Sequence, residues 1–530
     1  MTYENACVAR KMKPTRALFT FVFLRLALLS LTCVAFHFQA TSTFAIQLVP
    51  FVSPNGPSEA SEKIFKKNVQ LNCSSTFFVN YTPDHATSAL PDFTSHPPQY
   101  RSEPHMTISK DSSDVSVIED RRLSCGVRLL VESNPSVKSA AISWWVPTGT
   151  MDDPDGENAD GLAVLCAGML ERGAGGLDSR KFNDGLDRLG VIRNISVHDT
   201  STRLSASLRN EELPSALELL ADMMLDPMMP EDGLDPVRSL CLQSIQGLVD
   251  QPPELASIRL NHLALPAPFN RSAYGSSQAL ESATIEDVRT AWRARCLPEG
   301  SIIALAGGID FDDAAEILER RLAGWSGGSN DTPAPRPRIG GDEHVEQSGS
   351  QVHVEMAFDA PSLSSSDELS FLVATRILGG GSSSRLFDHV REQQGLCYDV
   401  HAGYLRRRSG SLCTIGAGTT PERVSRTIES IYEELDRFGS GGITQDEFDN
   451  VMVGLKTRLM MHGESMAARA AAIAADFHDR GAPRTLSEVA REIDELSHQG
   501  VDDLVRSYFN SEWASGVARV AVGPSTPFQS

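Results

Sequence analysis

The sequence predicts an α+β protein with two homologous domains, each a largely antiparallel sheet packed with helices, joined by a linker. A chain of 530 residues with 41% apolar residues exceeds what one hydrophobic core usually supports. Residues 326–349 are rich in Gly and Pro and separate two strongly patterned regions, which indicates a linker. We therefore expect one domain at residues 114–325 and a second at residues 350–526.

The two patterned regions resemble each other, and this indicates an internal repeat. Two segments recur in the same order: residues 178–182 with Gly190 recur as 383–387 with Gly395, and residues 285–288 recur as 501–504. We therefore expect both domains to contain the same succession of elements.

Each copy is expected to begin with strands, to continue with a helix, a glycine-rich turn and further helices, and to end on an apolar strand. In the first copy these elements fall at residues 127–146, 161–170, 173–176, 213–225 and 302–306. In the second copy they fall at residues 352–358, 367–378, 379–381, 422–435 and 517–522. Hairpin strands with helices grouped between them are typical of an antiparallel sheet.

The first 45 residues are typical of a secretory signal peptide. Lys11, Lys13 and Arg16 precede an apolar stretch at residues 17–38, and small residues precede Ile46. Met12 is an alternative start of translation. We therefore expect an exported protein, periplasmic or otherwise extracytoplasmic.

Arg25 divides this apolar stretch and opposes a permanent membrane span, because a charge at mid-membrane costs about 2.5 to 3.5 kcal/mol on insertion scales. The alternative is an uncleaved anchor that associates the protein with a membrane, and a mitochondrial transit peptide fits the continuous apolar block less well. Residues 46–113 are rich in Ser, Thr, Pro and Asn without periodicity, which predicts a disordered spacer.

The net charge and the spacing of the cysteines argue against several classes of protein. The formal net charge of −21, with no long basic run, argues against nucleic acid as a partner. The nine cysteines lie far apart and include no Cys-x-x-Cys pair. This pattern argues against both a disulfide scaffold and a thiolate zinc site.

One long motif carries a family resemblance. Residues 378–387 read LGGGSSSRLF, and residues 390–398 read VREQQGLCY. This motif resembles the second domain of insulinase-type (pitrilysin-like) zinc metallopeptidases. The similarity extends over residues 119–524 and is strongest to the short bacterial branch, which also includes the mitochondrial processing peptidase subunits and the core proteins of the respiratory bc1 complex.

In active members of that family, the first domain carries His-x-x-Glu-His on its first helix and a glutamate ligand further on. Two His at i and i+4 share one helical face and bind one metal, while the Glu activates the bound water. At the matching positions this chain has Val164, Ala167 and Gly168, and Ser244 lies in the helix that should carry the later ligand. The resemblance is therefore to an inactive subunit with no metal or cofactor of its own.

Other metal or nucleophile candidates are weak. No two histidines lie within four residues of each other, so no helical zinc pair is available. His344, His353 and His389 are interpreted as surface or packing residues. Cys166, with apolar neighbours, is interpreted as a buried small residue.

Arg391 and Tyr398 match a pair that the family retains. The resemblance implies that they reach toward a zinc site, where they hold the substrate backbone and the developing oxyanion. The alternative without a function is that Arg391 lies on a solvent-exposed face and Tyr398 packs in a hydrophobic core.

The glycines Gly379, Gly380 and Gly381 do not match a phosphate loop, because the Gly-Lys of that motif is absent. They are predicted to contact a substrate backbone, or alternatively to let the loop flex.

These observations favour a non-catalytic subunit of a heteromeric zinc peptidase acting on unfolded peptides. Its partner would be a zinc-bearing relative of the same family, and the zinc would reside in that partner. The first alternative is a structural or peptide-holding protein like the bc1 core subunits. An independent peptidase is the least favoured reading, because no pair of nucleophile and base stands out.

Overall fold

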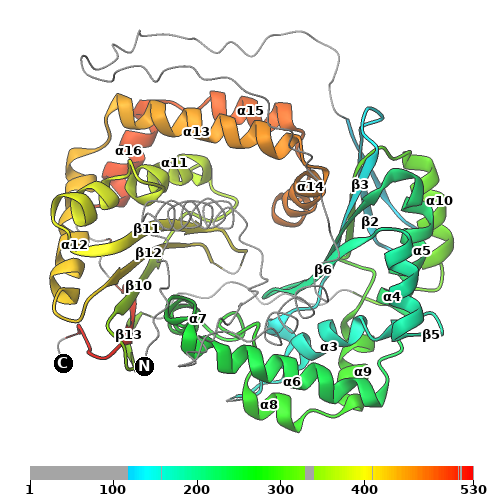
Figure 1. Cartoon of the computed structure of the whole chain (residues 1–530). Helices are drawn as coiled ribbons and strands as arrows, with labels where there is room; N and C mark the ends of the chain where they lie inside the picture. The colour runs from blue at the N-terminus through cyan, green and yellow to red at the C-terminus, as the bar shows by residue number, and fades with distance from the viewer. Residues whose placement is uncertain are drawn as a thin grey trace, which may run out of the picture. The chain divides into compact units, whose positions relative to one another are not determined.

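The computed structural model describes residues 117–156, 158–328, 340–408, 410–510, 513 and 516–528 (Figure 1). The predicted signal peptide at residues 1–45 and the predicted spacer at residues 46–113 lie outside the described residues.

The first half folds around a six-stranded sheet in the order β1-β2-β8-β3-β7-β6. Strands β2 and β8 run parallel, and the other pairs are antiparallel. The strands are β1 (Ile118–Arg122), β2 (Arg128–Ser133), β3 (Ser139–Val146), β6 (Ile192–Val197), β7 (Thr202–Arg209) and β8 (Ile302–Gly307), and a short hairpin joins β4 (Gly173–Ala174) to β5 (Leu177–Asp178).

Helices cover one face of this sheet and bury alternate strand residues such as Leu129, Ile142 and Leu204. Period-two alternation places these side chains on a single face, which is why the strands can be recognised in the sequence. The helices of this half are α3 (Leu162–Leu170), α4 (Ser179–Arg188), α5 (Leu213–Leu225), α6 (Glu231–Gly247), α7 (Pro252–Ala264), α8 (Ser277–Ser282), α9 (Ile285–Arg295) and α10 (Phe311–Leu322).

The second half repeats the plan with a five-stranded sheet in the order β11-β12-β10-β13-β9. Its strands are β9 (Gly341–Glu346), β10 (Val352–Asp359), β11 (Cys397–Leu405), β12 (Leu412–Thr419) and β13 (Ala518–Gly523). Its helices are α11 (Glu368–Gly379), the π-helix η4 (Phe387–Gln393), α12 (Val424–Gly441), α13 (Gln445–Gly463), α14 (Met466–Arg480), α15 (Leu486–Asp494) and α16 (His498–Tyr508). Two mixed, mostly antiparallel sheets packed with helices confirm the predicted fold class.

Strand β9 lies inside the range 326–349 that was predicted to be a linker, so that prediction is wrong for Gly341–Glu346. The segment lacks apolar alternation, and its pairing with β13 is parallel. Ion pairs supply what apolar burial does not: Arg519 donates two hydrogen bonds of 2.6 Å to Asp342, and Arg259 donates to Glu343 at 2.5 Å.

The two halves exchange one helix each. Helix α7 belongs to the first half in sequence but packs on β10 and β13, where Leu260 and Val520 share a small apolar core. Helix α14 belongs to the second half but packs on β3 and β8, where Ile473 contacts the core of that sheet face (Figure 1). The groups of elements that pack together therefore differ from the predicted domains, because α7 and α14 each pack on the sheet of the other half.

Within the part of the chain that the structure describes, every helix is too short or too polar to cross a bilayer.

Candidate functional site

Helix α3, which carries the positions matched to the zinc motif in the sequence analysis, is held at its start by a buried carboxylate. Asp153 accepts hydrogen bonds from the backbone N–H of Gly161 at 2.7 Å and of Ala163 at 2.8 Å. Burial raises the pKa of Asp153 to about 6, although these two hydrogen bonds oppose the shift. The carboxylate thus caps the helix and satisfies N–H groups that would otherwise lack partners.

The side chains on α3 offer no metal ligand at the critical positions. Val164 is half-buried, Ala167 is buried, and a Cβ atom at Gly168 would lie 2.6 Å from Cγ1 of Val237 on α6. Gly168 therefore lets α6 approach α3 closely, and a larger residue there would force the helices apart. Ser244, on α6, is exposed and bonds the backbone oxygen of Leu240.

A zinc ion does not fit these residues, because a valine, an alanine and a glycine have no side-chain lone pair to donate. Across the described residues, no three His, Cys, Asp or Glu side chains gather in an arrangement that could hold a metal ion. The three histidines considered above make separate contacts: His344 with the backbone oxygen of Gly523, His353 with Tyr398, and His389 with Gln394.

Cys166 lies in the core side of α3. Its thiol donates to the backbone oxygen of Val288 at 3.5 Å, and burial raises its pKa to about 12. A thiol with so high a pKa is not a nucleophile near neutral pH, which agrees with the packing interpretation.

Tyr398 is an exposed aromatic residue near the start of strand β11, and 44% of its surface is accessible. The pairing of β11 with β12 shifts register between Cys397 and Asp399, and the bulge contains Tyr398. Its hydroxyl reaches across β12 at Gly418, where any Cβ atom would overlap the phenol oxygen. On the far side it lies 3.2 Å from Nε2 and 3.3 Å from Nδ1 of His353 on β10.

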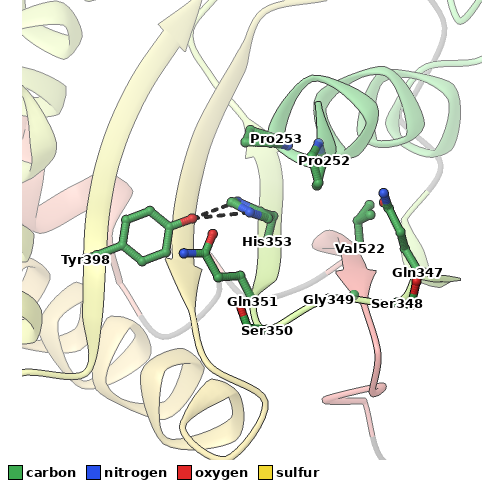
Figure 2. Close-up of a pocket in the computed structure, with 11 residues that line it drawn as sticks. Pro252, Pro253, Gln347, Ser348, Gly349, Ser350, Gln351, His353, Tyr398 and Val522 are labelled. Atoms are coloured by element: carbon green, nitrogen blue, oxygen red, sulfur yellow. Dashed lines mark hydrogen bonds between the residues drawn. The ribbon is translucent and has the colours of Figure 1, made fainter. Parts of the chain in front are cut away.

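Tyr398 and His353 form part of the wall of a cavity of about 420 Å³ (Figure 2). The remaining wall comes from the start of α7, the turn between β9 and β10, and the end of β13. None of the lining side chains carries a full charge at neutral pH, given that burial lowers the pKa of His353. The lining residues are Pro252, Pro253, Gln347, Ser348, Gly349, Ser350, Gln351, His353, Tyr398, Val522 and Gly523.

Arg391 lies on η4, which contacts β11, but it does not line this cavity. Its guanidinium stacks over the Phe387 ring at 4.4 Å from the centroid, and its Nε lies 3.7 Å from Glu392. Its charge also helps to lower the pKa of Asp399, whose largest influence is the hydrogen bond with His401. The two predicted residues thus occupy neighbouring elements but face different groups.

The glycines after α11 have local reasons of their own. Gly379 is buried, and a Cβ atom there would overlap the backbone of Ala402 on β11. Close helix-strand packing therefore accounts for Gly379. Gly381 is exposed with open space around it, so substrate contact stays a prediction for Gly380 and Gly381.

A row of titratable residues beside Tyr398 was missed in the sequence. Glu355 on β10 and His401 on β11 fold over Gly416 of β12, with Nε2 of His401 4.0 Å from Oε1 of Glu355. His401 also lies 3.4 Å from Asp399, and this contact raises the pKa of the imidazole. Glu355 is only 7% exposed, and burial raises its pKa to about 7.

A pattern in the sequence does indicate this row of residues. His353 and Glu355 alternate with buried Val and Met along β10, and Gly416 and Gly418 alternate along β12. Polar residues at every second position of an apolar strand indicate a sheet face that is not fully covered.

Comparisons with known proteins agree on one family. Residues 128–273 match the model described as insulinase (peptidase family M16), and residues 282–455 match the model described as peptidase M16 inactive domain. An uncharacterised zinc protease of Bacillus subtilis, YmxG, is 25% identical over 402 residues, covering 74% of this chain and 97% of the relative. An uncharacterised zinc protease of Mycobacterium tuberculosis is 26% identical over 400 residues, covering 74% and 91%.

Solved structures share the fold. A peptidase M16 inactive domain from Pseudomonas fluorescens has a TM-score of 0.70 at 21% identity, covering 77% of this chain and 98% of that chain. A protease from Helicobacter pylori has a TM-score of 0.68 at 17% identity, covering 77% and 100%.

Proposed function

The chain belongs to the insulinase family of peptidases, family M16, and we propose that it is the non-catalytic subunit of a two-chain zinc peptidase. In this proposal a zinc-bearing relative of the same family supplies the metal and the catalytic glutamate. This chain supplies Arg391 and Tyr398, and the pair of subunits cleaves unfolded peptides.

The observation that carries the proposal is a contrast between two sites in one chain. On helix α3, Gly168 packs against Val237, and the positions matched to the zinc ligands have no donor atoms. At the second site, Tyr398 remains exposed and its hydroxyl is aimed across a glycine at the edge of a cavity. An exposed, hydrogen-bonded aromatic residue that adds little to a core is better explained by binding than by packing.

The chemistry suits transition-state stabilisation. Burial raises the pKa of Tyr398, so the phenol keeps its proton at neutral pH and can donate it in a hydrogen bond. A donor held in place before the reaction stabilises a developing oxyanion without reorganising. The uncharged cavity next to it has room for several atoms of an extended peptide.

The orientation of Arg391 favours the alternative, a structural or peptide-holding protein like the bc1 core subunits. Its guanidinium contacts Phe387 and Glu392 and is not part of the cavity wall. For the catalytic role, Arg391 must leave the Phe387 ring when a partner and a peptide bind.

Reconstitution with a zinc-bearing relative tests the proposal. Tyr398→Phe keeps the ring and removes only the hydroxyl, so turnover should fall by about 10²- to 10³-fold, the scale of one oxyanion donor. Arg391→Ala should also lower turnover while complex size and melting temperature stay unchanged. The matched control is Tyr274→Phe, since that hydroxyl donates to Glu254 and neither residue lines the cavity. Unchanged turnover in both test variants would contradict the catalytic role and favour the structural or peptide-holding alternative.

We also propose that the protein is exported, on the basis of the basic start and apolar stretch before Ile46. N-terminal sequencing of the native protein should begin close to Ile46. An intact N-terminus in the membrane fraction would indicate an anchor, and an intact N-terminus in the cytoplasm would refute export.

A further inference from the structure

The hydroxyl of Tyr398 and the ring of His353 meet across a single glycine. The two rings are nearly perpendicular, at 79°, with centroids 6.1 Å apart, so the hydroxyl approaches the edge of the imidazole (Figure 2). Both ring nitrogens lie within 3.3 Å of the phenol oxygen. This contact involves nothing but side chains, and its partners come from strands that are not neighbours in the sheet.

Three features of the sheet create the contact. His353 on β10 and Asp399 on β11 both pair with Gly418, so β12 lies between them. The register shift before Asp399 puts Tyr398 at the irregular point of β11. Because Gly418 has no Cβ atom, the phenol can lie flat over β12 and reach the imidazole.

The rest of the row does not compete for His353. Glu355 and His401 meet over Gly416, the next glycine along β12, and His401 has Asp399 as its hydrogen-bond partner. Among the described residues, the His353 ring has hydrogen-bond contacts with Tyr398 alone.

We propose that His353 is the positioning residue for Tyr398 and holds the phenol hydroxyl at the cavity, where a peptide oxygen would meet it. The inference rests on the proposed role of Tyr398 in peptide cleavage. His353 itself acts through the tyrosine and does not touch the reacting atoms.

The protonation state of His353 fits this role. Burial lowers the pKa of His353, so at neutral pH the ring is uncharged, with one N–H donor and one acceptor nitrogen. In the resting chain the acceptor nitrogen can take the hydrogen bond of the phenol. When a substrate oxygen takes that bond instead, the ring N–H can donate to the same phenol oxygen once the imidazole turns. A turn is needed because the two nitrogens of one ring point in different directions, and which of them bonds the phenol depends on the tautomer.

The first test uses the isolated chain and needs no catalytic activity. The chain is labelled with 3-fluorotyrosine, and Tyr398→Phe identifies the resonance of position 398 among the eight tyrosines. We expect this resonance to shift in an acid titration with a midpoint below the usual histidine value of about 6.5. The step should vanish in His353→Phe and persist in the control His344→Gln, because His344 bonds the backbone of Gly523 instead. A step that survives in His353→Phe would overturn the proposal.

The second test uses the reconstituted pair. His353→Phe should lower kcat by about 10- to 100-fold with little change in KM, the range for a group that orients a functional one. His353→Gln, which keeps a donor and an acceptor, should recover most of the rate. The double variant His353→Phe/Tyr398→Phe should be no slower than Tyr398→Phe alone, because both changes remove one unit. Additive losses would refute positioning.

The two experiments separate the inference from the proposed function. A fluorine signal that follows His353, together with unchanged turnover in Tyr398→Phe, would refute the catalytic role but keep the contact. A fluorine signal independent of His353 would refute the positioning role whatever Tyr398 does in turnover.

Discussion

Arg469 of helix α14 and Glu132 of strand β2 form a buried ion pair between elements 337 residues apart in the chain. Nε of Arg469 lies 2.7 Å from Oε2 of Glu132, and the side chains are only 5% and 8% exposed. The same guanidinium donates to the backbone oxygen of Arg484 at 3.3 Å. This pair fastens α14 to the sheet of the first half, where Ala470 and Ile473 also pack.

Removing one member of this pair should destabilise the fold strongly. Arg469→Met leaves the Glu132 carboxylate buried without its counter-ion, and the expected loss is about 3 to 5 kcal/mol. Chemical denaturation of the isolated chain measures it. Arg426→Met, which breaks an exposed pair with Glu433, is the matched control and should leave stability nearly unchanged, because solvent screens an exposed ion pair. Equal losses in both variants would mean that α14 is not fastened in this way.

Introducing the His-x-x-Glu-His motif on α3 should not create a zinc site. The triple variant Val164→His, Ala167→Glu and Gly168→His is expected to bind no stoichiometric zinc, as measured by metal analysis after dialysis. Ser244 still supplies no acidic ligand, and the new side chain at position 168 collides with Val237. The collision should lower stability by about 1 to 3 kcal/mol.

Adding Val237→Ala to that triple variant is the control for the collision. It should recover part of the stability by opening space beside position 168, yet still leave zinc unbound. One tightly held zinc per chain in the triple variant would contradict our account of the vacated site.

Glu355 should make stability depend on pH. Its folded pKa of about 7 lies above the usual value of 4.5, so the folded chain keeps a proton that the unfolded chain releases. Stability from this group is therefore lost as pH rises from about 4.5 to about 7, and the deficit is complete above that range. At about 1.4 kcal/mol per pH unit, the loss is roughly 2 to 4 kcal/mol as an upper estimate.

The variant Glu355→Gln has no charge to bury, so it should be more stable than the natural chain at pH 8 and nearly equal at pH 5. His401 opposes the shift, while Asp399 on β11 and Glu254 on α7 add to it, so these three facing groups must stay intact. Denaturation at both pH values measures the difference, with the exposed Glu281→Gln as control. If the stability difference between the natural chain and each variant is the same at pH 8 as at pH 5, the assignment to Glu355 is disproved.

Much of the fold could be read from the sequence because it depends on local patterns. Alternation along β10 and the three- and four-residue spacing in α5 report which side of each element is buried. The lack of donor atoms at Val164, Ala167 and Gly168 was also visible, since the donor atoms of a zinc ligand belong to the residue type itself. The family motif likewise singled out Tyr398 as a candidate without any coordinates.

Other features depended on which surfaces meet in three dimensions. Periodicity marks the apolar face of α7 and α14 but does not say which sheet covers it, so the helix exchange was not foreseen. Strand β9 was missed because its stability comes from main-chain pairing and from ion pairs to Arg519 and Arg259, which lie far away in the chain.

The sequence by itself determined the α+β class, the repeated plan and the absence of metal-donor atoms from Val164, Ala167 and Gly168, because each of these is a property of residue type or local spacing. Only the tertiary structure decided that Tyr398 meets His353 over Gly418 and that Gly168 is closed off by Val237. Such encounters are set by strand register and helix approach, where a shift of one residue or of one methyl group changes the partner.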